Sequence, residues 1–307
     1  MITGSPTVEE LADRWKQDKQ DYVRLSTYST YVTLLERHIL PEFGPWHEIG
    51  EQDVQAFVLR KLQDGLSRAT VQETVLVLKM ILRHGAALGL CRRPDWVLHY
   101  PGTQAPAKPK LMQTEDVFWI LQVIHDHPNC KNIGIAICLY TGLRIGEICA
   151  LRWGDLDTGA EILHVRKTLA RVYLSDAQPP RGQLVLGPPK TGSSMRDVPL
   201  AKDLLALLKR LHADRRDPRA FVLSDGPEPL EPRAYRRYFA QFLDALGIPR
   251  INFHALRHTF ASRCIEMGSD CKTVSDLLGH ADVKTTLNLY VHPGMAQKKA
   301  CVNGLVG

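Results

Sequence analysis

Residues 251–292 read INFHALRHTFASRCIEMGSDCKTVSDLLGHADVKTTLNLYVH, and they place histidine, arginine and tyrosine side chains in a fixed order. His254, Arg257 and His258 are spaced i, i+3 and i+4, so on a helix they share one face. Histidines at i and i+4 also form half of some zinc sites, but no nearby Cys or Asp completes a ligand set, and Arg257 would oppose the cation. The spacing therefore indicates a catalytic or merely hydrogen-bonded helix face, and it disfavours a metal.

The second half of the stretch predicts two further helices. Gly279, at the end of Ser-Asp-Leu-Leu-Gly, is typical of the position where a helix ends, which leaves His280 in a turn. Asp282 then caps a helix that runs through Tyr290. A helix–turn–helix reader of DNA is an alternative for this segment. That alternative does not explain why the polar positions are His and Tyr instead of Arg, Asn and Gln.

Upstream, residues 7–100 predict helices throughout. The first helix begins after Thr7, a capping residue followed by two acidic residues. Pro41 and Gly44 are expected to end the second helix. Four amphipathic helices with short connections make a small bundle. The other three span about 27–39, 51–63 and 67–89.

Several helices are also expected between residue 112 and the opening stretch. The helix over 133–140 is nearly all apolar, which predicts a central place in the core, and Gly142 ends it. Arg144 falls in the first turn of the helix that follows. Besides the helix over 133–140, the expected helices begin at Thr114 as an N-cap and cover residues 143–151, about 202–213 and about 232–246.

Strands are expected only in the middle of the chain. Residues 161–174 alternate and are rich in β-branched and aromatic residues, which predicts one strand. Residues 183–186 and 195–200 flank GPPKTGSS, and we expect them to form a β-hairpin with a mobile tip. The fold class expected is mainly α with a small antiparallel β-sheet: a helical bundle followed by an α+β domain.

Composition limits the class of protein. The 307 residues carry a formal charge of +6, which suits a polyanionic partner without requiring one. The seven cysteines are scattered and form no Cys-x-x-Cys pair, which indicates a reducing compartment. No apolar run approaches the ~18 residues that span a bilayer. We therefore expect a cytoplasmic protein with no membrane partner.

Five segments in order carry a resemblance to a known family. They are TGLRIGEICALRW from Thr141, PPKTGSSMRDVPL from Pro188, HALRHTFAS from His254, LLGH ending at His280, and LNLYVH from Leu287. Their order and spacing resemble the tyrosine recombinases, the lambda-integrase-like or phage integrase family. HxxR alone would be weak, whereas five segments in order are specific.

The resemblance implies a division of the reaction among named residues. Tyr290 matches the nucleophile that forms a 3′-phosphotyrosyl bond, and His254 matches the proton acceptor. Arg144 and Arg257 match the pair that grips the non-bridging phosphate oxygens. Lys190 matches the general acid that protonates the leaving 5′-oxygen. No cofactor and no metal are expected.

Further residues are expected to support this site. His280 matches a position that donates to the phosphate, and Glu147 matches an acidic residue that orients an arginine or imidazole. His258 is expected to support the site or to pack in the core. The candidate DNA contacts outside the catalytic set are Arg68, Lys108, Lys110 and Arg196. For Arg196, a bond that stabilises the fold is an equal alternative to a phosphate contact.

The resemblance also implies an organisation and partners. We expect a core-binding helical domain over residues 1–100, a linker over 101–112, a catalytic domain over 113–294, and a tail over 295–307 that packs on a neighbouring protomer. The partners would be double-stranded DNA carrying specific sites, three further copies in a synaptic tetramer with a Holliday-junction intermediate, and accessory DNA-bending proteins. An N-terminal arm-binding domain is not expected in this sequence.

Two other functions stay open at this point. A type IB topoisomerase has similar chemistry and relaxes supercoils as a monomer, and a catalytically inactive relative would only bind DNA. A helical bundle before the catalytic domain favours recombination, and the filled catalytic positions disfavour an inactive protein. The expectation is a recombinase associated with the nucleoid of a bacterium, either a mobile-element integrase or an Xer-like enzyme.

Overall fold

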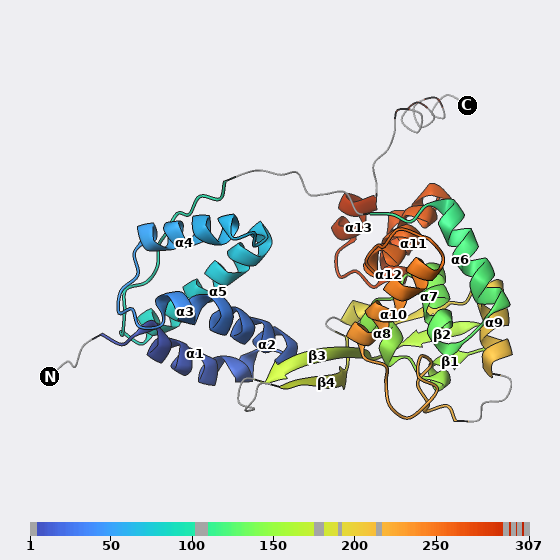
Figure 1. Ribbon diagram of the computed structural model, residues 1–307, viewed down its shortest axis with the longest axis horizontal. Helices are drawn as coiled ribbons and strands as arrows, with labels where there is room; N and C mark the ends of the chain where they lie inside the picture. Colours follow the sequence, from blue (N-terminus) through green and yellow to red (C-terminus); the bar gives the residue numbers. More distant parts are fainter. Residues whose placement is uncertain are drawn as a thin grey trace. The chain divides into compact units, whose positions relative to one another are not determined.

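The computed structural model describes residues 5–101, 110–174, 181–189, 192–212 and 217–290, together with residues 295, 299 and 303. The chain divides into two compact units. Unit 1 contains the described residues within 1–106 and 171–183, and unit 2 contains those within 107–170 and 184–307. The described part of the chain is mainly helical with two small antiparallel sheets, which confirms the expected fold class (Figure 1).

Unit 1 is a helical bundle built around its longest helix, α5. That helix packs against α1, α2 and α4 and buries a continuous apolar stripe. Thr7 caps α1 through a reciprocal pair of hydrogen bonds with Glu10, and Ser67 caps α5. The elements are α1 (Val8–Tyr22), α2 (Leu25–Leu34), the π-helical turn η1 (Leu35–Ile39), α3 (Leu40–Phe43), α4 (Glu51–Gln63) and α5 (Arg68–Ala87).

The second helix continues farther than expected. Pro41 does not end it, because the π-helical turn η1 comes first and the N–H of Leu40 donates to the carbonyl of Leu35. Pro41 then falls in the first turn of α3, where a missing N–H is tolerated. The helix ends only at Gly44, whose N–H still donates to Leu40.

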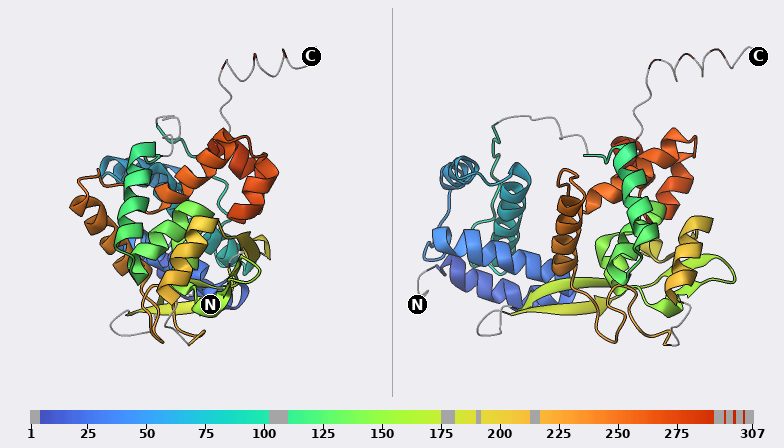
Figure 2. Two further views of the ribbon diagram at one scale, coloured as in Figure 1. Left: turned by 90° about the vertical axis from the view of Figure 1, so that its right-hand side faces the viewer. Right: turned by 45° about the vertical axis from the view of Figure 1, so that its right-hand side comes forward.

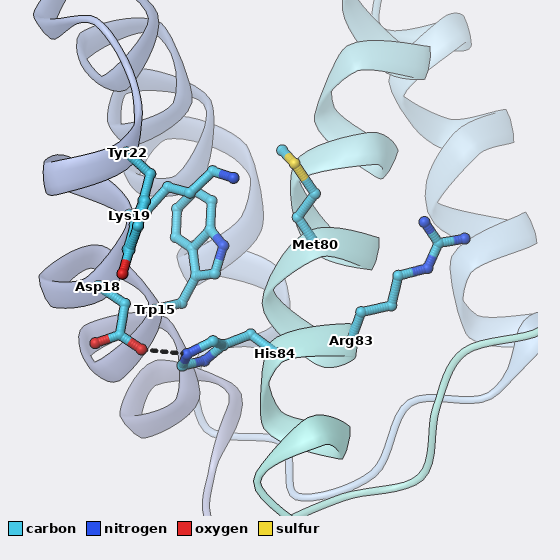
Figure 3. Close-up of a pocket in the computed structure, with 7 residues that line it drawn as sticks. All are labelled: Trp15, Asp18, Lys19, Tyr22, Met80, Arg83 and His84. Carbon is cyan, nitrogen blue, oxygen red and sulfur yellow. Dashed lines mark hydrogen bonds and ion pairs between the residues drawn. The ribbon is translucent and has the colours of Figure 1, made fainter.

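The contact between α1 and α5 leaves a shallow pocket on the bundle (Figure 3). Trp15 is buried at its base, and Tyr22 is exposed at its edge. His84 of α5 and Asp18 of α1 close one side, with Nε2 and Oδ2 2.6 Å apart. This bond ties the two helices together outside their apolar contact.

Unit 2 surrounds one buried helix, α7, which packs against α6, α8, α9, α10 and α11. Asn129 caps α7, and Gly142 ends it in the left-handed conformation at φ 64°. In Figure 2 α6 and α9 run along one side of the unit, while α11 to α13 gather at another. The helices are α6 (Thr114–Asp126), α7 (Cys130–Thr141), α8 (Ile145–Ala150), α9 (Lys202–His212), α10 (Pro232–Ala245), α11 (His254–Glu266), α12 (Cys271–Leu278) and α13 (Val283–Tyr290).

Three details of the helices correct or extend the sequence interpretation. Gln113 occupies the N-cap position of α6, so Thr114 is its first residue and not its cap. Arg144 directly precedes α8 instead of lying in its first turn. No described helix is long and apolar enough to cross a membrane.

The strand pairing differs from the expectation. The segment 161–174 contains two strands in different sheets, because the chain leaves the first sheet after Val165. The predicted hairpin between 183–186 and 195–200 is wrong: β4 pairs with β3, whereas β5 pairs antiparallel with β2. The strands are β1 (Leu156–Asp157), β2 (Ile162–Val165), β3 (Thr168–Leu174), β4 (Arg181–Gly187) and β5 (Arg196–Pro199), with two short 3₁₀ turns, η2 (Trp153–Asp155) and η3 (Gly192–Ser194).

The error arises because a strand pattern does not identify the partner strand. Alternation identifies a strand and its buried face, but it carries no information about which other strand supplies the hydrogen bonds. Here Val165 lies opposite Arg196, and Ile162 lies opposite Pro199. Arg166 then bonds to the carbonyl of Arg196 at 2.9 Å, which holds the strand ends together where β2 stops.

Candidate active site

The C-terminal end of α12 forms the base of the candidate site. Gly279 follows the helix in the left-handed conformation at φ 66°. A Cβ at this position would come within 2.9 Å of Arg196 Nη1 and 3.0 Å of the Ser193 carbonyl oxygen. Glycine is therefore required here both by the backbone conformation and by the close approach of the neighbouring turn.

Three arginines from distant parts of the chain bind the last carbonyls of α12. Arg196 Nε donates to Leu277 at 2.6 Å, Arg257 Nη2 donates to Leu278 at 2.9 Å, and Arg144 Nη2 donates to Gly279 at 3.2 Å. The carbonyl end of a helix carries partial negative charge, so it stabilises cations. One helix end thereby gathers three guanidinium groups.

Arg257 is the largest fully buried side chain of the described residues, with 1% of its surface exposed. Its Nη1 donates to the carbonyl of Gly142 at 2.7 Å, while Nη2 reaches Leu278. A buried charge requires such partners, because its desolvation is otherwise costly. Arg257 thus joins the end of α7 to the end of α12.

Glu147 of α8 lies between two of the arginines. Its Oε1 accepts from Arg144 Nη1 at 2.9 Å, and its Oε2 accepts from Arg196 Nη2 at 3.1 Å. The backbone N–H of Arg144 also donates to Oε2 at 2.9 Å. Burial raises the pKa of Glu147, but the charges and hydrogen bonds of Arg196 and Arg144 outweigh burial and hold the pKa below its usual value. The carboxylate is therefore ionised and bridges both guanidinium groups.

His254 and His258 start α11 as neighbouring rings. Their centroids are 4.5 Å apart and the ring planes meet at 85°. His254 is exposed to solvent, yet desolvation by its neighbours, followed by the charges of His258, Arg257 and Arg144, lowers its pKa to about 4. Desolvation and Arg257 also lower the pKa of His258. At neutral pH His254 is an uncharged imidazole, as a proton acceptor must be.

His280 leaves the end of α12 half-buried beside the arginines. Its Nδ1 lies 2.8 Å from the hydroxyl oxygen of Thr286, which is fully buried on α13. Desolvation, Arg257, Arg144, Arg196 and His254 lower the pKa of His280 to about 4. The sequence does not indicate this role of Thr286, because nothing in Lys-Thr-Thr shows which threonine lies beside an imidazole.

The lowered pKa values of His254 and His280 predict that the stability of the fold depends on pH. Their pKa values of about 4 in the folded chain lie below the ~6.5 of an unfolded chain. The unfolded chain therefore binds more protons in this window, so the stabilising effect of the neutral rings is complete above about pH 6.5 and is lost as the pH falls towards about 4. We expect the melting temperature to fall over that range.

A matched pair of variants isolates this effect. His280→Asn keeps an acceptor or donor near Thr286 and should flatten the decline in melting temperature. His125→Gln alters an exposed histidine of the same unit and serves as the control. Equal declines in the wild type and His280→Asn would contradict the assignment of the effect to His280.

The structure describes some of the other predicted site residues and not others. Tyr290 is the last residue of α13, and α13 packs against α11 and α12; its side chain lies outside the described part of the chain. Lys190 and Lys108 also lie outside the described residues. Lys110 is exposed just before unit 2's first helix. The structure brings together six of the predicted residues, two of which precede the other four by more than 100 residues: Arg144, Glu147, His254, Arg257, His258 and His280.

The remaining candidate DNA contacts differ in their surroundings. Arg68 is the first residue of α5, and its guanidinium lies 5.5 Å from the centre of the Tyr100 ring. Arg196 is 8% exposed and bonds within the protein. Arg68 and Lys110 thus lie where a polyanion can reach them, while Arg196 sits inside the candidate site.

An open cavity of about 280 Å³ adjoins His254. Leu143 and Ile145 line it beside Arg144, and Arg236 of α10 lines it from another side. His254, which lines the cavity, is exposed to solvent. The combination of guanidinium groups, a neutral imidazole and space beside them suits an anionic, oxygen-rich substrate whose reaction develops negative charge.

Two family models match the chain. The model of the phage integrase family matches residues 110–297, and that of the phage integrase N-terminal SAM-like domain matches residues 7–61. The first match alone covers more than half of the 307 residues.

Curated proteins with similar sequences are named recombinases and integrases. The tyrosine recombinase XerC-like protein of Caldanaerobacter subterraneus subsp. tengcongensis is 27% identical over 273 residues, which cover 82% of this chain and 69% of that protein. The ICEBs1 integrase of Bacillus subtilis is 25% identical, with 86% and 73% covered.

Solved structures share the fold. The Tn1549 transposon integrase in complex with transposon right end DNA has a TM-score of 0.80 at 23% identity, covering 98% of this chain and 100% of that chain. The lambda integrase tetramer bound to a Holliday junction has a TM-score of 0.66 at 18% identity, covering 94% and 78%. The predicted arrangement of a helical bundle and an α+β domain is confirmed by these likenesses.

Proposed function

This chain belongs to the phage integrase family, and from that premise we propose how its residues divide the breaking and rejoining of DNA. The chain is a site-specific DNA recombinase of the tyrosine class. The observation that carries the assignment of roles is the gathering of three guanidinium groups at the end of α12, one helix before Tyr290. His280 follows that helix end, and His254 of α11 is close enough to act on its pKa.

Tyr290 is the nucleophile in this proposal. Its hydroxyl oxygen attacks a phosphorus of the DNA backbone, and its proton passes to His254, whose pKa of about 4 keeps the imidazole neutral beforehand. The bond from phosphorus to the 5′-oxygen breaks as the tyrosine–phosphorus bond forms. The Lys190 ammonium donates a proton to the leaving 5′-oxygen. The products are a 3′-phosphotyrosyl bond and a free 5′-hydroxyl.

Arg144, Arg257 and His280 hold the phosphate. Arg144 donates to Glu147 and Gly279, and both of its bonds hold the plane of the guanidinium. Arg257 is held in the same way by Gly142 and Leu278. Planar guanidinium groups of fixed orientation suit the non-bridging oxygens of a phosphate. Since the two arginines are fixed by the fold before DNA arrives, they need no reorganisation as negative charge develops. Glu147 and His258 orient these groups.

The wider assembly is also part of the proposal. We assign residues 1–100 to DNA binding beside the core site, 113–294 to catalysis, 101–112 to a linker, and 295–307 to contact with a neighbouring protomer. Arg68, Lys108 and Lys110 are the proposed backbone-phosphate contacts. Four copies would act on two duplex sites through a Holliday junction, with accessory DNA-bending proteins and in association with the bacterial nucleoid. The solved lambda integrase tetramer on a Holliday junction supports this organisation.

Two assays run side by side test the function. A recombinase joins two DNA molecules that carry its site, and it does so with a second-order or higher dependence on protein. A topoisomerase relaxes a supercoiled plasmid with one site and as a monomer. Relaxation without joining, over a panel of candidate sites, would contradict the recombinase assignment.

Cleavage is expected to proceed at the same rate in the presence of EDTA. The proposed site supplies positive charge from Arg144 and Arg257, so a divalent cation has no role left on the phosphate. The measurement is the rate of covalent adduct formation after dialysis against the chelator. Loss of cleavage that Mg²⁺ restores would contradict the proposed roles of the arginines.

A further inference from the structure

Arg196 is a charged side chain held almost entirely inside unit 2. It begins β5 and is 8% exposed. All three of its guanidinium nitrogens donate within the protein: Nε to the Leu277 carbonyl at 2.6 Å, Nη1 to the Ser194 carbonyl at 3.0 Å, and Nη2 to Glu147 at 3.1 Å. The guanidinium therefore contacts three elements: the turn η3 directly before β5, helix α8, and the end of helix α12.

A buried ion pair of this kind is an inefficient source of stability. Removing two charges from water is costly, and a well-packed apolar pair of the same volume often stabilises a fold equally well or better. What the fork of a guanidinium supplies in addition is orientation, because its planar donors fix the atoms that they contact. Its contacts therefore show what Arg196 orients.

The first group oriented is Glu147, and through it Arg144. Oε2 of Glu147 accepts from Arg196 Nη2 at 3.1 Å and from the Arg144 backbone N–H at 2.9 Å, while Oε1 accepts from Arg144 Nη1 at 2.9 Å. A carboxylate with a partner on each oxygen has one orientation. Arg144 receives its own orientation from that carboxylate and from Gly279.

The second group oriented is the end of α12, from which His280 leaves. Arg196 holds the Leu277 carbonyl, and the Ser194 hydroxyl donates to the Gly279 carbonyl at 3.4 Å. The turn η3 and β5 approach Gly279 so closely that a Cβ would meet Arg196 Nη1 at 2.9 Å. Arg196 thus helps to fix the position of His280 relative to Arg144, together with the bonds of Arg144 and Arg257 to the end of α12.

We propose that Arg196 is a positioning residue: it holds the Glu147 carboxylate and the carbonyl end of α12 so that Arg144 and His280 face one phosphate. The inference rests on the proposed function, in which those two residues bind the phosphate. It replaces the sequence-based expectation that Arg196 contacts DNA directly.

The test compares Arg196→Lys and Arg196→Met with the wild type on a single DNA site. Arg196→Lys keeps the positive charge that Glu147 requires, but an ammonium group cannot reach Glu147, Leu277 and Ser194 together. We expect both variants to form the covalent adduct about 10–100-fold more slowly in single-turnover conditions, the usual effect of losing a group that orients a ligand. We expect DNA affinity to change by less than about 3-fold.

The salt dependence of DNA binding distinguishes positioning from direct contact. If Arg196 orients other residues, the slope of log K against log salt concentration stays as in the wild type. If Arg196 neutralises a phosphate, its loss lowers the slope by about 0.9 and weakens binding. That second outcome would overturn the proposal. Arg219→Met removes one exposed arginine, paired with Asp217, from the same unit and is the charge control.

The pH dependence distinguishes positioning from a merely structural role. The charged and titratable groups that act on or near Glu147 are Arg144, Arg196 and the buried Cys138 thiol. Without Arg196, burial dominates and raises the pKa of Glu147, so cleavage by Arg196→Met should decline at a higher pH than in the wild type. Adding Glu147→Gln should remove this shift, because Gln does not titrate. A rate lowered equally at every pH would overturn the proposal.

Failures of the two proposals are distinguishable in the same experiment. Absence of a covalent adduct with the wild-type chain counts against the proposed function. Normal adduct formation by the wild type together with unchanged rates in both variants counts against the role of Arg196 alone. Melting temperatures report whether each variant folds, and if Arg196→Met does not fold, Arg196→Lys carries the comparison.

Discussion

Tyr290→Phe is expected to abolish the covalent protein–DNA adduct and all joining of DNA, while affinity for the site stays within about 2-fold. Phenylalanine has the same ring and the same helical fit at the end of α13, but it has no oxygen to attack phosphorus. No other described tyrosine stands one helix beyond the arginine cluster, so no neighbouring hydroxyl is expected to replace it. The change is therefore one of chemistry and not of fold.

The adduct is measured as a protein–DNA species that survives denaturing electrophoresis, using a nicked substrate from which the 5′-hydroxyl fragment escapes. Tyr140→Phe, a half-buried tyrosine on α7, is the matched control and should form the adduct at the wild-type rate. A labelled peptide other than the one containing Tyr290 would show that the nucleophile is misassigned. Wild-type adduct levels from Tyr290→Phe would show the same.

Arg257→Lys is expected to have the second-largest effect, on both catalysis and stability. The guanidinium spans the Gly142 and Leu278 carbonyls, at 2.7 Å and 2.9 Å, and in the proposed mechanism it also binds the phosphate. An ammonium group cannot span both, so at least one buried carbonyl loses its donor, which costs about 1–3 kcal/mol of unfolding free energy. Cleavage should fall about 10²–10³-fold, as for the loss of one donor to a developing anion.

Arg263→Lys is the control for this variant. Arg263 lies on the same helix, and its guanidinium lies 5.5 Å from the centre of the exposed Phe118 ring. Its replacement should change cleavage and melting temperature little. If Arg257→Lys lowers stability but leaves the cleavage rate of the folded fraction unchanged, Arg257 is a structural residue and its proposed contact with phosphate is wrong.

The helices of this protein could be located from local chemistry. Thr7, Ser67, Gly142 and Gly279 marked helix ends correctly, because capping and the left-handed conformation depend on residues a few positions apart. The helix over 51–63 has its expected bounds, which follow from one apolar face and from Gly65 beyond its end. The exception was Pro41, where a π-helical turn shifted the hydrogen bonds before the proline.

The sheets could not be paired in the same way. The alternation over 161–174 predicts one strand, and the patterns of 183–186 and 195–200 predict a hairpin between them. Strand pairing depends on contacts between residues that are far apart in the sequence. β2 pairs with β5, which follows about 30 positions later, and not with β3, which follows it directly in the chain. The local alternation of apolar and polar residues does not indicate which strand will be the partner.

For the site, the sequence alone determined the class of reaction, because five segments in order resemble the tyrosine recombinases, and the comparisons confirm that class. What only the tertiary structure decided is how the arginines are held. They bind backbone carbonyls at the end of α12, with partners up to 135 residues apart, and Arg196 joins them through Glu147. Every residue has a carbonyl, so no sequence pattern can indicate which carbonyls lie free at a helix end and within reach of a guanidinium.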